Sequence, residues 1–409
     1  MLYVYATAAV LDEVNGPLSL RAVETEMPAP GEVLVRIAGA GICHTDLTAM
    51  AGGVPLPLPA VLGHEGAGEV VAVGPVADLA VPDVAVPDVV VPDVVVPGPV
   101  RIGDRVVLSF DSRRACRNCR RGHPAYCSRF APLNYGGTRE DGTTTLRAAG
   151  GTRVHGNWFG QSSFATCAVA SSRNAVRVPA DVPLPLAGPL GCGIQTGAGS
   201  VLEVLRPEPG ASLAVFGCGP VGLSAVLAGV IAGCTEIYAV DPSPARRDLA
   251  VELGATTAFD PDAGRGPVEA IRACSRRGVD YSVDTVSSEP VLQQALRVLA
   301  SPGHCATLGL RGPRNPVTLD QSLVLTGRTL TGVIEGDVDP HTFIPRMVDY
   351  WREGRFPFRK MITTYPFEAI GDALAAVRAG DVVKAVLTFD TSADTDAVAG
   401  TDAAAGGKE

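Results

Sequence analysis

The stretch Ser-Leu-Ala-Val-Phe-Gly-Cys-Gly-Pro-Val-Gly at residues 212–222 decides the fold, because an apolar run leads directly into a Gly-x-Gly-x-x-Gly turn. The apolar run predicts a strand at 212–216, and the residues at 221–232 predict a helix. In such a unit Gly217 permits the tight turn, Gly219 lets the backbone approach a pyrophosphate, and Gly222 allows close helix–strand packing. The stretch therefore predicts a dinucleotide site with the phosphates at the helix N-terminus.

The residues that follow continue the alternation of strands and helices. Strands are expected at 236–240 and 281–284 and a helix at 291–299, which together predict a parallel α/β sheet. Asp241 follows the second strand, where a carboxylate can accept the ribose hydroxyls and repel a 2′-phosphate. We therefore expect NAD rather than NADP. The alternative interpretation is a simple glycine turn followed by a helix-capping Asp241.

The first 80 residues have a different sequence pattern. β-branched runs at 33–37 and 69–73, separated by Gly and Pro, predict antiparallel strands, and residues 343–389 are expected to return to this first domain. Between them, residues 81–99 repeat Val-Pro-Asp with a five-residue period. Proline at that spacing excludes a helix or a central strand, so we expect an exposed loop, which is either a tolerated duplication or a docking arm. Residues 391–409 have little to bury and are predicted to be disordered.

Composition excludes several classes of protein. A chain of 409 residues favours two or three domains. A net charge of -9 without a basic cluster argues against a nucleic-acid partner. The sequence has neither a charged leader nor an apolar run of about 18 residues, so we expect a cytoplasmic protein without a membrane partner. Ten cysteines are too few for a disulfide scaffold.

Two groups of residues carry metal-binding chemistry. The first is Cys43, His64 and Cys192, because thiolate and imidazole suit zinc and three ligands with one open position are typical of catalytic zinc. Spacing alone leaves open that these are buried cysteines and a core histidine.

The second group is Cys116, Cys119 and Cys127, which predict a small metal-bound lobe. Three thiols are one fewer than a closed site uses. His123 is a candidate fourth ligand, and the alternative is a surface-loop histidine. The other cysteines are expected to be small buried hydrophobes: Cys167, Cys218, Cys234, Cys274 and Cys305.

Taken together, the motifs at 41–46, 63–69, 116–127, 189–193 and 217–222 resemble the zinc-dependent medium-chain alcohol dehydrogenases over about residues 6–390, excepting the repeat. Residues 159–165, 191–199, 335–337 and 343–345 resemble the bacterial aryl-alcohol (benzyl alcohol) dehydrogenases. The resemblance implies an α/β protein in which a GroES-like, mostly antiparallel catalytic domain, residues 1–193 and 334–390, surrounds a doubly wound Rossmann domain, residues 194–333.

The resemblance also implies roles for individual residues. Cys43, His64 and Cys192 would bind a catalytic zinc, with Asp46 and Glu65 orienting these ligands. Zinc would lower the pKa of the alcohol hydroxyl, and hydride would pass to NAD.

The resemblance also implies roles for residues in and next to the motif at 41–46. Thr45 would take the alcohol proton, or else would cap a helix beginning near Asp46. His44 would lie beside the pyrophosphate. Thr48 stands where many relatives have histidine, so the exit of the proton is left open.

The sequence departs from the family pattern at the lobe, where Arg113 occupies the position of the first thiolate. We therefore expect one zinc per chain.

Phe110, Trp158 and Phe159 could line an apolar pocket or serve as core aromatics. The predicted activity is oxidation of a primary, aromatic or allylic alcohol by a homodimer or homotetramer. The alternatives are a thiol-adduct formaldehyde dehydrogenase and a non-catalytic NAD-binding redox sensor.

Overall fold

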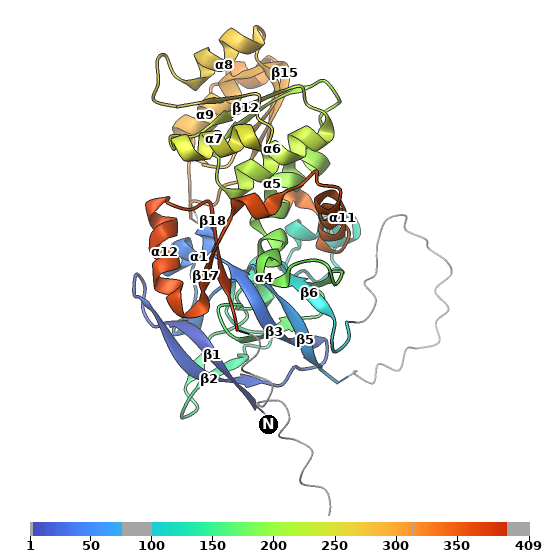
Figure 1. Cartoon of the computed structure of the whole chain (residues 1–409), viewed down its shortest axis with the longest axis vertical. Coiled ribbons are helices and arrows are strands. Elements are labelled where there is room, and N and C mark those ends of the chain that lie inside the picture. Colours follow the sequence, from blue (N-terminus) through green and yellow to red (C-terminus); the bar gives the residue numbers. More distant parts are fainter. Residues whose placement is uncertain (1–2, 76–99, 313, 391–409) are drawn as a thin grey trace, which may run out of the picture.

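The computed structural model describes residues 3–75, 100–312 and 314–390, and its upper part in Figure 1 is built on a six-stranded parallel sheet. The strand order β13-β12-β11-β14-β15-β16 is that of the dinucleotide-binding fold. The strands are β11 (Ser212–Phe216), β12 (Glu236–Val240), β13 (Thr257–Phe259), β14 (Val279–Asp284), β15 (Leu299–Thr307) and β16 (Arg328–Gly332). The parallel α/β sheet predicted from residues 212–222 is confirmed.

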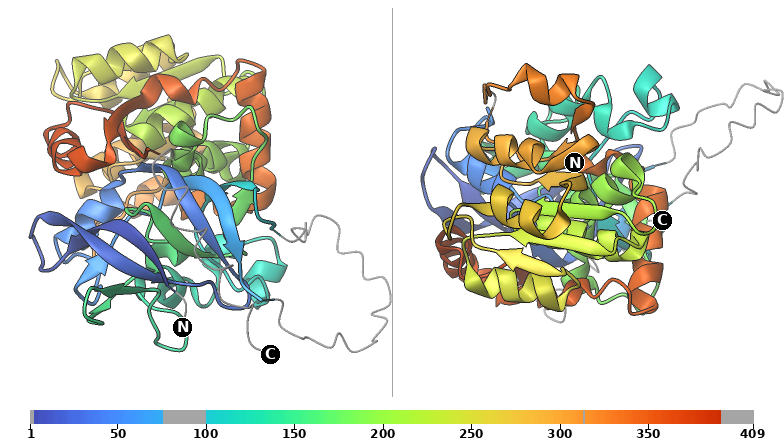
Figure 2. Two further views of the ribbon diagram at one scale, coloured as in Figure 1. Left: turned by 60° about the horizontal axis from the view of Figure 1, so that its bottom comes forward. Right: turned by 90° about the horizontal axis from the view of Figure 1, so that it is seen from above.

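Helices cover both faces of this sheet (Figure 2, right). They are α6 (Pro220–Ala232), α7 (Pro244–Glu252), α8 (Pro267–Ser275), α9 (Glu289–Arg297) and α10 (Gln321–Leu325). Alternation along β11 explains the two layers, since Leu213 packs with α6 while Phe216 packs with α8 and α9. The helix predicted at 291–299 begins and ends two residues earlier. It cannot extend to residue 299 because Leu299 already belongs to β15.

The lower part of Figure 1 consists mainly of two largely antiparallel sheets. A five-stranded sheet contains β1 (Tyr3–Leu11), β2 (Leu18–Glu26), β4 (Ala60–Val61), β7 (Leu146–Ala148) and β8 (Arg153–Val154). A seven-stranded sheet contains β3 (Glu32–Gly41), β5 (Gly66–Val73), β6 (Arg105–Leu108), β9 (Cys167–Ser171), β10 (Ala175–Arg177), β17 (Ile362–Pro366) and β18 (Lys384–Thr388). The antiparallel strands predicted in the first 80 residues are confirmed.

The seven-stranded sheet joins distant parts of the chain. β18 pairs antiparallel with β3, with Val386 opposite Gly41, as expected from the predicted return of residues 343–389. The helical elements around the sheets are α1 (His44–Met50), α2 (Arg117–Arg120), η1 (Pro124–Tyr126), α3 (Phe130–Tyr135), η2 (Trp158–Gly160), α4 (Leu184–Ala187), η3 (Gly188–Gly191), α5 (Gly193–Gly199), η4 (Ser200–Leu205), η5 (Glu335–Asp337), α11 (Pro340–Arg352), η6 (Phe358–Met361), η7 (Phe367–Ala369) and α12 (Ile370–Ala379).

Helix α5 links the two parts of the molecule. A Cβ atom on Gly197 would lie 1.9 Å from the carbonyl oxygen of Val221, so only glycine lets α5 approach α6 this closely. Cys192 immediately precedes α5. The domain boundaries given above remain predictions.

Two sequence predictions lie outside the described residues: the loop at 81–99 and the disordered tail at 391–409. Val100, next to the repeat, is 8% exposed and packs in the core of the lower part. No helix within the three described ranges is long and apolar enough to cross a bilayer.

Candidate catalytic zinc and cofactor site

Four potential ligand groups meet between the two parts of the molecule. Cys43 follows β3, His64 and Glu65 lie between β4 and β5, and Cys192 precedes α5. Their ligand atoms lie within 4.8 Å of one another. The fold thus brings the predicted set of Cys43, His64 and Cys192 together, with Glu65 beside it.

The His64 ring is oriented for metal binding. Its Nδ1 lies 2.9 Å from Oδ1 of Asp46. Its Nε2 is buried and has no hydrogen-bond partner among the residues that the structure describes. A buried imidazole nitrogen left open beside two thiols fits zinc, which is bound in proteins by nitrogen and sulfur ligands. Burial disfavours a charged His64, but the charges of Asp46 and Cys43 outweigh burial and raise the pKa of the imidazole.

Asp46 forms hydrogen bonds with two of the candidate ligands. Its Oδ2 accepts a hydrogen bond from the backbone N–H of Cys43 at 3.1 Å, and its Oδ1 accepts one from Nε1 of Trp158 at 3.0 Å. Because the same Oδ1 contacts His64, one carboxylate orients two of the candidate ligands. The contact of Trp158 with Asp46 could not be predicted from a local pattern, since the two residues are 112 positions apart.

The start of α1 decides between the two interpretations of Thr45. The helix begins at His44 with Cys43 as its N-cap, so the interpretation of Thr45 as a helix cap is wrong. The Thr45 hydroxyl oxygen lies 3.7 Å from Sγ of Cys43. His44 is exposed, and Thr48 donates its hydroxyl to the carbonyl of His44 at 2.9 Å.

The two thiols of the site shift each other's pKa in opposite directions. The hydrogen bond from Cys192 lowers the pKa of Cys43, and the same hydrogen bond, with burial, raises the pKa of Cys192.

Glu65 has a buried partner that the sequence analysis missed. Nζ of Lys384 lies 2.8 Å from each carboxylate oxygen of Glu65 and donates to the carbonyl of Ile42 at 3.0 Å. Burial raises the pKa of Glu65, and the Lys384 charge opposes this rise. Burial disfavours charge on Lys384 too, but Glu65 outweighs it and the pKa of the lysine is raised. A lysine at the start of the apolar run 384–387 was the available signal.

Glu335 also lies at the site and was missed as a site residue. Its Oε1 is 3.6 Å from Sγ of Cys192, and its Oε2 accepts a hydrogen bond from Nε2 of Gln195 at 3.0 Å. Burial raises the pKa of Glu335 to about 7. The turn that presents it has three consecutive positive φ angles, +51° at Glu335, +73° at Gly336 and +52° at Asp337. Such a conformation is uncommon outside glycine and leaves little trace in a sequence.

Aromatic rings surround His64. Phe159 stacks on the imidazole with a centroid distance of 4.3 Å and contacts Trp158, Phe130 and Tyr135. The three aromatic residues singled out in the sequence, Phe110, Trp158 and Phe159, are all buried. They are core aromatics in this structure, and Phe159 reaches the metal-ligand cluster as well.

The glycine turn has the geometry that a dinucleotide requires. Gly217 has a φ of +91°. A Cβ on Gly222 would lie 1.8 Å from the carbonyl oxygen of Gly217, whereas one on Gly219 would have no neighbour within 4 Å among the described residues. The open space at Gly219 fits a pyrophosphate against the N-terminus of α6.

Asp241 lies beside this turn. Its carboxylate accepts hydrogen bonds from the backbone N–H groups of Cys218 at 2.7 Å and Ser243 at 2.9 Å. The N-cap of α7 is Ser243, so Asp241 does not occupy the capping position of that helix.

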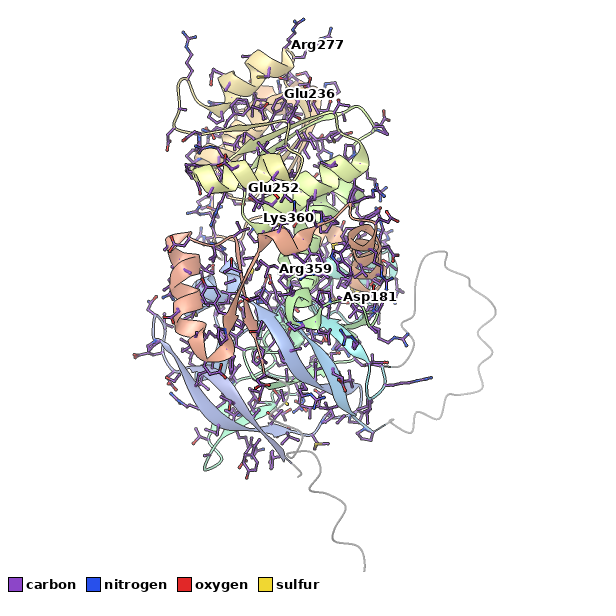
Figure 3. The ribbon with its side chains drawn as sticks, in the orientation of Figure 1. Asp181, Glu236, Glu252, Arg277, Arg359 and Lys360 are labelled. Atoms are coloured by element: carbon purple, nitrogen blue, oxygen red, sulfur yellow. The ribbon has the colours of Figure 1, made fainter. Side chains whose placement is uncertain are left out.

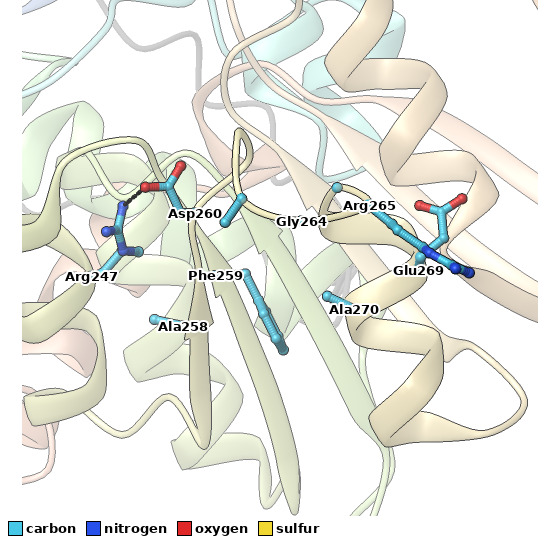
Figure 4. Close-up of a pocket in the computed structure, with 10 residues that line it drawn as sticks. Arg247, Ala258, Phe259, Asp260, Gly264, Arg265, Glu269 and Ala270 are labelled. Atoms are coloured by element: carbon cyan, nitrogen blue, oxygen red, sulfur yellow. Dashed lines mark ion pairs between the residues drawn. The ribbon is translucent and has the colours of Figure 1, made fainter.

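A cavity of about 560 Å³ lies next to the site, at the end of β13 (Figure 4). Arg247 lines it, pairs with Asp260 at 3.2 Å, and donates to the carbonyls of Asp241 and Pro242. Arg246 donates to two other carbonyls, those of Gly380 and Val382. Arg247 is therefore neutralised by an acidic partner, whereas Nε of Arg246 has no hydrogen-bond partner among the described residues.

The second cysteine group also forms a cluster, since the thiols of Cys116, Cys119 and Cys127 lie within 4.8 Å of one another. His123 does not join them: its Nδ1 lies 2.9 Å from the carboxylate of Asp337. The expectation that the remaining cysteines are buried is wrong for two of them, because Cys274 is exposed and Cys234 is partly exposed.

The fold and the site together define a zinc- and dinucleotide-dependent dehydrogenase. A family model described as an alcohol dehydrogenase GroES-like domain matches residues 29–180, and one described as a zinc-binding dehydrogenase matches residues 220–350. The chain belongs to the zinc-dependent medium-chain alcohol dehydrogenase family. The predictions of the family, the GroES-like and Rossmann fold, an enzyme, and zinc and NAD as cofactors are confirmed.

Relatives cover nearly the whole chain. A geraniol dehydrogenase from Castellaniella defragrans is 46% identical over 389 residues, which is 95% of this chain and 98% of the relative. An alcohol dehydrogenase zinc-binding domain protein from Burkholderia ambifaria has a TM-score of 0.87 at 42% identity, covering 95% of this chain and 100% of the other. A benzyl alcohol dehydrogenase from Acinetobacter calcoaceticus has a TM-score of 0.85 at 36% identity, covering 94% and 99%.

Proposed function

We propose that this protein oxidises a primary allylic or aromatic alcohol to its aldehyde and transfers the hydride to NAD. The names of two similar proteins, a geraniol dehydrogenase and a benzyl alcohol dehydrogenase, support this substrate class. The observation that carries the proposal is the buried, unpartnered Nε2 of His64 facing two thiols, since this donor set suits a catalytic zinc.

Cys43, His64 and Cys192 would hold the zinc. When bound, the zinc acts as a Lewis acid that makes the alcohol hydroxyl easier to deprotonate. Asp46 orients Cys43 and His64 through hydrogen bonds. Glu65, paired with Lys384, places a buried ion pair behind the ligands.

Thr45 is the residue that would hold the alcohol proton, because its hydroxyl lies next to Cys43. The Thr48 hydroxyl donates to the carbonyl of His44, so Thr48 would not end the proton relay and the exit of the proton lies elsewhere. The exposed His44 lies on the same turn of α1 and would face the cofactor phosphates and solvent.

For the cofactor, Gly217, Gly219 and Gly222 would surround the pyrophosphate, and Asp241 would bind the ribose hydroxyls. NAD is favoured because the Asp241 carboxylate would repel a 2′-phosphate and the neighbouring Arg247 is already paired with Asp260. The cavity at Arg247 would receive the adenosine end of the cofactor.

We also propose that the enzyme works in the cytoplasm as a homodimer or homotetramer. Leu325, the last residue of α10, is an exposed apolar side chain just before the edge strand β16, and this position supports assembly. Light scattering on the purified protein measures the assembly state.

The test of function is NADH absorbance with NAD and either geraniol or benzyl alcohol. We expect turnover that a chelator abolishes, and we expect Cys192→Ala to lose turnover while still binding NAD. Cys274→Ala, at an exposed cysteine, is the matched control. Turnover only with formaldehyde and an added thiol would favour the thiol-adduct alternative, and a fully active, metal-free Cys192→Ala protein would refute the zinc mechanism.

A further inference from the structure

The cysteine lobe, residues 113–127, lacks the donors for a closed structural zinc site. Within the described part of the chain, the cluster of Cys116, Cys119 and Cys127 includes no fourth histidine, cysteine or carboxylate. Structural zinc is almost always held by four protein ligands in a tetrahedron. The three thiols therefore do not fit a structural zinc.

The two candidates for the missing position are bound elsewhere. Arg113 directs its guanidinium group to Glu140, with Nη2 2.8 Å from Oε1 and Nε 3.3 Å from Oε2. His123 contacts Asp337, as described above. Neither side chain turns toward the thiols.

Other interactions hold the lobe in place. Arg114 forms an ion pair with Asp339, including a hydrogen bond of 3.1 Å from Nη1 to Oδ1. The Tyr126 hydroxyl donates to the carbonyl of Gly332 at 3.0 Å, and Nδ2 of Asn118 donates to the carbonyl of Tyr126 at 2.7 Å. The lobe is thus attached to residues 332–339 without a metal.

The three thiols differ in access and in contact. Sγ of Cys116 lies 3.4 Å from Sγ of Cys119, and Cys116 is the partly exposed member. Cys119 and Cys127 are buried, with 9% and 5% exposure. Cys127 accepts the backbone N–H of Arg113 at a distance of 3.5 Å. Cys116 is therefore the accessible thiol of the cluster, and Cys119 is the thiol in direct contact with it at 3.4 Å.

We propose that Cys116 and Cys119 form a reversible dithiol–disulfide pair that hydroperoxides oxidise. The Cys116 thiolate attacks the outer oxygen of the peroxide, the O–O bond breaks, and a sulfenic acid forms with release of water or an alcohol. Cys119 then attacks the Cys116 sulfur, an S–S bond forms, and the sulfenic oxygen leaves as water. The two thiols lose two electrons and two protons, and the peroxide gains both; a dithiol reductant reverses the change by thiol–disulfide exchange.

The experiment exposes the reduced, zinc-containing full chain to hydrogen peroxide, alkylates the remaining thiols and maps peptides by mass spectrometry. We expect a Cys116–Cys119 disulfide, about one zinc per chain, and oxidation of Cys116 ahead of the exposed Cys274. In Cys119→Ser the Cys116 sulfenic acid should persist and be trapped by dimedone. Cys116→Ser should form no disulfide in the lobe, and Cys274→Ser should behave as the unmodified chain.

Three outcomes would overturn the proposal: two zinc ions per chain with a peroxide-resistant lobe, a disulfide that uses Cys127 instead, or oxidation of Cys116 no faster than that of Cys274. None of these readouts depends on alcohol oxidation. Failure of the proposed pair is therefore distinguishable from failure of the proposed function.

Discussion

At the scale of single residues, Asp46 has the largest share in shaping the zinc site. Its two oxygens contact the backbone of one candidate ligand, the ring of another and the indole of Trp158. A ligand that is held in place before the metal arrives loses less conformational freedom on binding. The affinity for zinc should therefore depend on groups that never touch the metal.

Trp158→Phe tests this dependence, because it keeps an aromatic ring but removes the Nε1–H donor to Asp46. We expect zinc affinity to fall roughly tenfold or more, measured by competition with a chromophoric chelator. Trp351→Phe is the matched control, since Trp351 lies on α11 and contacts Phe358 rather than the site. Equal zinc affinity in both variants would contradict the role given to Trp158.

Asp241→Ala tests the basis of cofactor choice. Removing the carboxylate removes the charge that opposes a 2′-phosphate, so we expect the ratio of kcat/KM for NAD to that for NADP to decrease. Steady-state kinetics with both cofactors measures the ratio. An unchanged ratio would assign the preference to Arg246, Arg247 or another group.

Sequence reasoning reached those site residues that lie in short motifs, and missed those defined by distant contacts. Cys43 and His64 belong to recognisable stretches, and glycine spacing indicated the turn at 217–222. Glu335 contacts Gln195 across 140 residues, and Lys384 contacts Glu65 across 319. Such partners depend on how the sheets are assembled, which no local pattern encodes.

At the scale of elements, the strands were easier to locate than the ends of the helices. The apolar runs at 212–216 and 236–240 coincide with β11 and β12, because each strand is buried on both faces. The helix α9 ended before its predicted limit because Leu299, an apolar residue that suits either structure, starts β15.

We expect the pair β15–β16 to make the stability of the nucleotide-binding part depend on pH. His304 lies on β15, contacts the Thr331 hydroxyl on β16 at 2.8 Å, and burial lowers its pKa below 6.5. Well above pH 6.5 the imidazole is neutral in the folded and the unfolded chain. As the pH falls below this value the unfolded chain takes up a proton that the folded chain resists, so the free energy of unfolding decreases.

His304→Gln should therefore lose less stability than the unmodified chain between about pH 7.5 and about pH 5.5. Urea unfolding at both pH values measures the difference. His44→Gln, at an exposed histidine, should lose as much as the unmodified chain. A His304→Gln protein with the full loss would show that other groups govern the acid response.

At the scale of the whole molecule, two lysines show how burial determines what an ion pair contributes to the free energy of unfolding. Lys384 and Glu65 are 2% and 0% exposed, whereas Lys360 and Glu252, labelled in Figure 3, form an ion pair of 2.6 Å with exposures of 48% and 55%. Removing one partner of a buried pair leaves an uncompensated charge, while an exposed pair is screened by water.

We therefore expect Lys384→Met to reduce the free energy of unfolding by about 3–5 kcal/mol, and Lys360→Met by less than about 1 kcal/mol. Adding Glu65→Gln to Lys384→Met should restore part of the loss, because the unpaired charge is then absent. Denaturant titrations measure all three proteins. Equal effects of the two lysine substitutions would contradict the buried pair as a link between β18 and the residues next to β5.

The pairing of β3 with β18 also sets an order of events during synthesis. Glu65 is synthesised before Lys384, and 319 positions separate the two residues. This separation corresponds to roughly 16–64 s at about 5–20 residues per second. Over that interval the Glu65 carboxylate has no lysine to pair with. Residues 39–41 of β3 then lack a strand on the side that β18 later occupies, although β5 already pairs with Gly39 and Ala40 on the other side. The nucleotide-binding part can be complete while the zinc pocket is still unfinished. We therefore expect metal loading to be completed only after β18 is in place, and the nascent chain has to keep an unpaired strand edge from other chains until then.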